Sequence, residues 1–186
     1  MEFLSQLWLP IVVAAVLVFV VSSVIHMALP IHKSDKRLLP AEAKVAEALR
    51  GTLPGEYMMP GCTSMKDMGT PEMKAKYEKG PIALLTVMPN GVPKIGKALV
   101  RWFLFSLLVG VITGYVAWHA LGAATTDYLR VFQITGAVAW MAYGIGELPN
   151  SIWKGTPGST TFKFVIDGLA YSLVTAGAFG WLWPRH

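Results

Sequence analysis

Four apolar stretches, each long enough to cross a lipid bilayer, dominate this chain of 186 residues. They cover residues 1–29, 97–121, 127–147 and 161–184. At about 1.5 Å per helical residue, roughly 20 residues cross the hydrocarbon core. Only 15% of the residues are charged, whereas a soluble domain carries about 25%. The sequence therefore predicts an all-α polytopic membrane protein with four transmembrane helices in a compact bundle.

Basic residues gather on one side of these spans. They follow the first span, open the second and separate the third from the fourth: Lys33, Lys36, Arg37, Lys44, Lys94, Lys97, Arg101, Lys154 and Lys163. The opposite side carries only Arg130 and Arg185. Because cytoplasmic loops are enriched in Lys and Arg, we expect the insert 30–96 to be cytoplasmic and both termini to lie outside. The pattern resembles four-span proteins of the bacterial inner membrane, which implies a location but no activity.

The start of the chain does not have the features of a cleaved signal peptide. Its apolar run is too long, no basic segment precedes it, and no A-x-A-like site follows. We expect an uncleaved first span. The net charge of +5 reflects the cytoplasmic side and suits anionic lipid. The basic residues of the insert alternate with acidic ones, so no nucleic acid is predicted as a partner. The expected partners are the bilayer, other membrane subunits or a second copy.

The insert 30–96 contains signals for short helices and for a hairpin. "LPAEAKVAEALRG" places Pro40 near a helix start and Gly51 at its end. "TPEMKAKYEKG" repeats this order, with Thr70 as the N-cap and Gly80 as the terminator. Residues 82–88 are apolar and precede the turn "PNG", which favours a strand or a hairpin across that turn. We therefore predict a mixed short-helix and hairpin insert between the first two spans.

Small residues form a ridge along the fourth span and part of the second. In the fourth span they recur every four residues: Gly168, Ser172, Ala176 and Gly180. In the second, Gly110 and Gly114 form a GxxxG pair. Such ridges let another helix approach closely. The contact is with a helix of the same chain or with another subunit, and the short loops favour the first interpretation.

A ring of polar groups is predicted near the cytoplasmic ends of the spans. Its members are Asp167 inside the fourth span and, at the same expected level, His26, Arg101, Glu147 and Asn150. An ionisable residue within a span is a functional hypothesis by default, for an ion, a proton or a polar ligand. The alternative is a structural ion pair between Asp167 and Arg101, which their position close to the membrane surface favours.

The sequence contains candidate ligands for two metal cofactors, Cu(I) and haem. The only cysteine, Cys62, and the nearby Met65 and Met68 are soft ligands that suit Cu(I). Their loose spacing and the lack of a CxxC pair favour a loop that packs. Haem is not predicted, because His26 and His119 lie at opposite ends of the spans, and His32 and His186 lie outside them.

No catalytic motif was found in the sequence, so an enzyme is not predicted. The first hypothesis is an accessory or structural subunit of a membrane assembly, in which the small-residue ridges contact neighbouring helices. The second is a small transporter or an ion- or proton-handling protein that uses the polar ring. The third is a Cu(I)-binding membrane protein that uses Cys62 and its neighbouring methionines.

Overall fold

The computed structural model describes residues 2–122 and 127–184. Arg185 and His186 lie outside the described residues. The helices are α1 (Glu2–Ser23), α2 (Glu42–Ala48), α3 (Pro71–Lys79), α4 (Ile95–Leu121), α5 (Tyr128–Tyr143), α6 (Leu148–Trp153) and α7 (Gly158–Leu182). The strands are β1 (Gly55–Met59) and β2 (Ala83–Val87). The chain forms two compact units, one made of residues 1–36 and 94–186 and the other of residues 37–93.

Three helices of the first unit are long and apolar enough to cross a membrane. They are α1 with the turn that extends it, Glu2–Ala28, then α4 and α7, with 27, 27 and 25 residues. Their positions follow from uninterrupted apolar sequence, which is helical in lipid because every backbone N–H and C=O must be paired internally. The predicted helical fold is confirmed, and three of the four expected spans form helices that are compatible with a membrane protein.

The fourth expected span, residues 127–147, is not one continuous α-helix. Helix α5 ends at Tyr143 after 16 residues. A 3₁₀ turn, Ile145–Glu147, and the short helix α6 follow it. Glycine and proline weaken a helix, and this stretch contains Gly144, Gly146 and Pro149. The break therefore has a local cause in the sequence.

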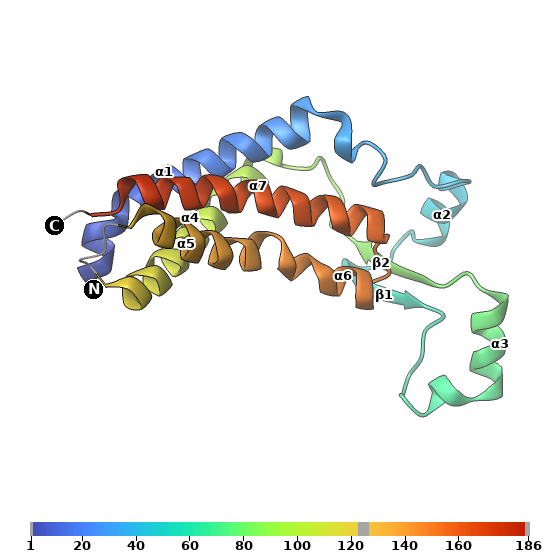
Figure 1. The fold of residues 1–186 in the computed structure, drawn as a ribbon. Helices are drawn as coiled ribbons and strands as arrows, with labels where there is room; N and C mark the ends of the chain where they lie inside the picture. Colours follow the sequence, from blue (N-terminus) through green and yellow to red (C-terminus); the bar gives the residue numbers. More distant parts are fainter. Residues whose placement is uncertain (1, 123–126, 185–186) are drawn as a thin grey trace. The chain divides into compact units, whose positions relative to one another are not determined.

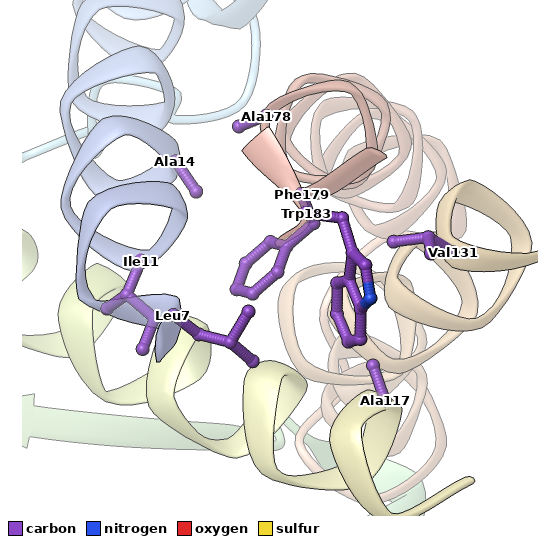
Figure 2. Packing of buried hydrophobic residues seen from close by; sticks show 8 residues of the cluster. All are labelled: Leu7, Ile11, Ala14, Ala117, Val131, Ala178, Phe179 and Trp183. Atoms are coloured by element: carbon purple, nitrogen blue, oxygen red, sulfur yellow. The ribbon is translucent and has the colours of Figure 1, made fainter. Parts of the chain in front are cut away.

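The long helices contact one another in pairs. Helix α7 packs against α5 and α1, and α4 packs against α1 and α5. Figure 1 shows α7 in red beside α1 in blue and α5 in orange. One core cluster brings the four together, and Figure 2 shows the Phe179 and Trp183 rings within it. Its other members are Leu7, Ile11, Ala14, Ala117, Val131 and Ala178.

The small residues of α7 face α5 within the same chain. A Cβ added at Gly168 would lie closer than 3.0 Å to backbone atoms of Tyr143 and Gly144. Farther along α7, a Cβ at Gly180 would meet the Tyr128 ring at 2.7 Å. The two helices are therefore in direct backbone contact at Gly168.

The GxxxG pair of α4 also has contacts inside the chain. A Cβ at Gly110 would lie 3.2 Å from the Ile11 side chain, and one at Gly114 would lie 3.3 Å from the Phe179 ring. Neither ridge needs a second polypeptide to account for its small residues.

The second unit, residues 37–93, contains the two predicted helices. In α3 the Thr70 side chain accepts a hydrogen bond from the Met73 N–H, which confirms Thr70 as the N-cap. The strand predicted near residues 82–88 is β2, but it does not pair across the turn that follows it. It pairs antiparallel with β1, from Gly55 opposite Val87 to Met59 opposite Ala83. The expected hairpin across "PNG" is therefore wrong, and the prolines around that turn explain why.

Candidate functional site

The chain reverses sharply where α1 ends. After Ser23 the helix widens into a π-helical turn, Val24–Ala28, which carries His26. Leu29 is extended, as expected for a residue before proline, and a 3₁₀ turn, Pro30–His32, follows. This reversal returns His32 to His26, with their ring centroids 4.4 Å apart.

Helix α7 presents Asp167 to the two histidines. The Asp167 side chain is only 6% exposed, and its Oδ2 lies 2.9 Å from His32 Nε2 and 3.9 Å from His26 Nε2. The closer pair is not arranged as a hydrogen bond, and both atoms are buried without a hydrogen-bond partner. A buried carboxylate that faces histidines without forming a hydrogen bond is costly, so this arrangement needs a functional or structural explanation.

A second carboxylate, that of Asp35, contacts the other ring nitrogen of His32. Asp35 Oδ2 lies 2.6 Å from His32 Nδ1. The Asp35 pKa is lowered, first by the hydrogen bond from Lys163 and then by the one from His32. Asp35 is therefore ionised at neutral pH and accepts a hydrogen bond from the His32 Nδ1–H. This leaves His32 Nε2 as the ring atom that faces Asp167.

Lys163 of α7 fastens the segment that contains His32 and Asp35. Its ammonium donates hydrogen bonds to the Ile31 carbonyl at 2.8 Å, to Ser34 Oγ at 2.9 Å and to Asp35 Oδ1 at 2.6 Å. These bonds use all three ammonium protons. Because α7 carries both Lys163 and Asp167, one helix sets the position of Asp35 on one side of His32 and of Asp167 on the other.

A cavity of about 400 Å³ opens beside Asp167. Its walls are largely apolar and aromatic, with His26, Glu147 and Asp167 as its ionisable groups. The lining residues include Trp102, Phe105, Tyr143, Phe164 and Tyr171. The Tyr171 hydroxyl also lies 3.2 Å from His26 Nε2. A cavity of this size with a few convergent polar groups is typical of a small-ligand site.

The predicted polar ring is only partly brought together. His26 and Asp167 are close, and Glu147 lines the same cavity while accepting a hydrogen bond from Asn150 at 2.7 Å. Arg101 is exposed and, among the described residues, forms no ion pair with Asp167. The expected Asp167 to Arg101 pair is therefore wrong: Asp167 faces His32 instead.

Sequence reasoning missed three residues of this site: His32, Asp35 and Lys163. It placed His32 and Asp35 outside the spans and used Lys163 only as a basic residue that marks one side of the membrane. The spacing of two histidines six apart with a proline between them, followed by Asp35, was the available signal. A proline that ends a helix can fold the second histidine back on the first.

The methionine-rich segment has a different character from the predicted packing loop. Met58 and Met59 belong to β1, and Met65 and Met68 are 84% and 39% exposed. Only Met73, from α3, is buried among the five methionines of residues 55–73. The Cys62 thiol donates to the Ser64 carbonyl at 2.9 Å. Packing therefore explains Met73 but not the others.

His26, His32 and Asp167 form the one group of at least three His, Cys, Asp or Glu residues that can hold a metal ion within residues 2–122 and 127–184. Their ligand atoms all lie within 4.8 Å of one another. No family model matches the chain, and no curated protein or solved structure is significantly similar to it. This site is therefore the main indication of function in the described residues.

Proposed function

We propose that this chain is an integral protein of a bacterial inner membrane that binds and transports a cation through the site at His26, His32 and Asp167. The main support for this proposal is the buried Asp167 carboxylate. Its Oδ2 has no hydrogen-bond partner, although two histidines face it. Ion pathways and proton relays are among the functions that such an ionisable group marks within a membrane helix. The adjoining cavity supplies space for the ion and its water.

In this proposal α5 is the fourth membrane span. Its 16 residues reach roughly 24 Å at 1.5 Å per residue. The 3₁₀ turn that follows has three residues and adds roughly 6 Å, so that together they match a hydrocarbon core of about 30 Å. Helix α5 also packs against α7 and α4, two helices apolar enough to span.

The proposed orientation puts the insert 30–96 in the cytoplasm and both termini outside. Cys62 is the only cysteine, so it reports this directly. In intact cells, a membrane-impermeant maleimide should not label Cys62, and permeabilised cells should be labelled. Glu2→Cys in a Cys62→Ser background is the matched control and should be labelled in intact cells. Labelling of Cys62 in intact cells would reverse the orientation.

Cation transport depends on the Asp167 charge. In proteoliposomes, the wild-type chain should carry H⁺ or a divalent cation, measured with a pH-sensitive dye and a metal-sensitive dye. Asp167→Asn keeps the shape but removes the negative charge, and should lower that flux at least tenfold, which is about 1.4 kcal/mol.

The matched control is Asp127→Asn. Asp127 caps α5 through hydrogen bonds from the N–H groups of Leu129 and Arg130, and asparagine caps a helix equally well. This variant should keep the wild-type flux. Wild-type rates no faster than those of empty liposomes, or equal rates for Asp167→Asn and wild type, would contradict the proposal.

The accessory-subunit hypothesis loses its main support. It rested on the small-residue ridges of α4 and α7, whose contacts lie within the chain at Ile11, Phe179 and Gly144. The Cu(I) hypothesis has only soft ligands of loose spacing in its favour. Neither has an observation as specific as the buried Asp167 carboxylate that faces two histidines.

A further inference from the structure

We infer that the cation of this site is a divalent transition metal of the zinc type, held by His26 Nε2, His32 Nε2 and the Asp167 carboxylate. The inference rests on the proposed function and narrows it, because it names the chemical class of the ion. On this inference the site prefers a transition-metal ion to alkali and alkaline-earth ions.

The spacing of the three ligand atoms fits one small ion. Ligands about 2.0–2.1 Å from a tetrahedral zinc ion lie roughly 3.3 Å from one another. The Asp167 Oδ2 distances to His32 Nε2 and His26 Nε2 are 2.9 Å and 3.9 Å, on either side of that value. All three atoms lie within 4.8 Å of one another. An ion between them needs only small side-chain adjustments.

The orientation of the closest pair also favours a shared ion. His32 Nε2 and Asp167 Oδ2 are 2.9 Å apart, both buried and neither hydrogen-bonded. In a direct ion pair, an imidazolium N–H would point at the oxygen. Two ligands of one metal instead point at a third position between them. The geometry of this pair therefore fits two ligands of one ion.

Asp35 fits the outer partner of a metal-binding histidine. Such a histidine almost always donates its other ring N–H to a carboxylate or a carbonyl, which fixes the ring and makes the ligand nitrogen more basic. The His32 Nδ1 to Asp35 Oδ2 distance is 2.6 Å. Lys163 holds Asp35 Oδ1 at 2.6 Å, so the carboxylate is itself positioned.

The donor set selects the class of metal. Imidazole nitrogens suit Zn²⁺, Co²⁺, Ni²⁺ and related ions, whereas Mg²⁺ and Ca²⁺ prefer sites built from oxygen. No thiolate takes part, which disfavours Cu(I). With three protein ligands, a fourth position remains for water or a bound molecule, as in catalytic zinc sites. His26 and Asp167 line the 400 Å³ cavity, so an ion held between them borders that space.

Metal binding has one local cost. Without the ion, the Tyr171 hydroxyl lies 3.2 Å from His26 Nε2, and this hydrogen bond is lost when the nitrogen becomes a ligand. The two buried atoms that lack partners gain one at the same time. The exchange therefore gives His32 Nε2 and Asp167 Oδ2 a shared partner and costs the Tyr171 hydroxyl its hydrogen bond.

The test uses Co²⁺ as a spectroscopic substitute for Zn²⁺ on the full-length protein, purified in mild detergent and treated with a chelator. We expect one Co²⁺ per chain with visible d–d absorption of a four- or five-coordinate ion, displaced by one equivalent of Zn²⁺. His32→Ala and Asp167→Asn should each weaken binding by more than about 100-fold, because each removes a ligand rather than an outer partner. The control is His119→Ala. His119 lies in the last turn of α4 and is not one of the three proposed ligands, so this variant should bind Co²⁺ like wild type.

Asp35→Asn keeps all three ligands and decides the case even where a ligand variant fails to fold. It should weaken Co²⁺ binding by about 10- to 100-fold. Unchanged affinity in Asp35→Asn, or wild-type binding no stronger than that of Asp167→Asn, overturns the inference. Saturable binding of one Co²⁺ without Asp167-dependent flux supports the metal site and removes the transport proposal. Asp167-dependent proton flux without Co²⁺ binding overturns the metal site and keeps the transport proposal.

Discussion

Gly168→Ala should lower the stability of the protein by at least about 3 kcal/mol, the upper end of the usual cost of overpacking. The added Cβ would lie closer than 3.0 Å to backbone atoms of Tyr143 and Gly144. Backbone atoms cannot rotate away as a side chain does, so α7 and α5 must separate along their contact. The gain in helix propensity from glycine to alanine, about 1 kcal/mol, does not offset this. Thermal unfolding in detergent, followed by circular dichroism, measures the change.

Gly177→Ala provides the matched control on the same helix. A Cβ at Gly177 meets no atom within 4 Å, so only the propensity gain remains, and the unfolding midpoint should stay the same or rise. Equal midpoints for Gly168→Ala and Gly177→Ala would mean that α5 and α7 are farther apart than the described geometry. Because Asp167 directly precedes Gly168, the separation should also disturb the cation site, and Co²⁺ binding on the same sample reports this.

Phe179→Ala should cost about 2–4 kcal/mol. Phe179 is 0% exposed and its ring lies among Leu7, Ile11 and Trp183 in the cluster of Figure 2. In soluble proteins, Phe→Ala in a core costs about 3–5 kcal/mol, from transfer and from the cavity left behind. In lipid the transfer contribution is smaller, because the acyl chains are as apolar as the core, so most of the loss is van der Waals contact.

Phe162→Ala separates this loss of contact from a general effect of removing a phenyl ring. Phe162 is also on α7 but is 65% exposed, so its truncation should change stability by less than about 0.5 kcal/mol. A similar loss of stability in both variants would count against the core described around Phe179. The comparison needs only unfolding in the same detergent at the same protein concentration.

The sequence was sufficient to predict most of the helical structure. The apolar runs that become α1, α4 and α7 are uninterrupted, and lipid allows such runs no alternative to helix. It was not sufficient for α5, because a hydropathy pattern does not register the break at Gly144 and Gly146. It also could not identify the partner of β2, because the pairing joins residues far apart in the sequence: Met59 pairs with Ala83, 24 residues later, and Gly55 pairs with Val87, 32 residues later.

The same limits explain which residues of the site were predicted. Asp167 and His26 were recognisable because an ionisable group within an apolar run is unusual. His32 was not, because its distance from His26 in space depends on the reversal at Leu29 and Pro30. Once that reversal is known, the Asp167 side chain has a closer partner than Arg101. The polar residues of the sequence therefore indicated two of the three proposed ligands, His26 and Asp167, but not His32.

The three hydrogen bonds of Lys163 have a mechanical consequence. They fix Ile31, Ser34 and Asp35 to α7 just before the chain passes into residues 37–93. A force on residues 37–93 that is transmitted along the chain would therefore act on the Lys163 hydrogen bonds to Ser34 and Asp35 before it reaches His32. Lys163 thus anchors the connecting segment to α7 between His32 and the start of residues 37–93.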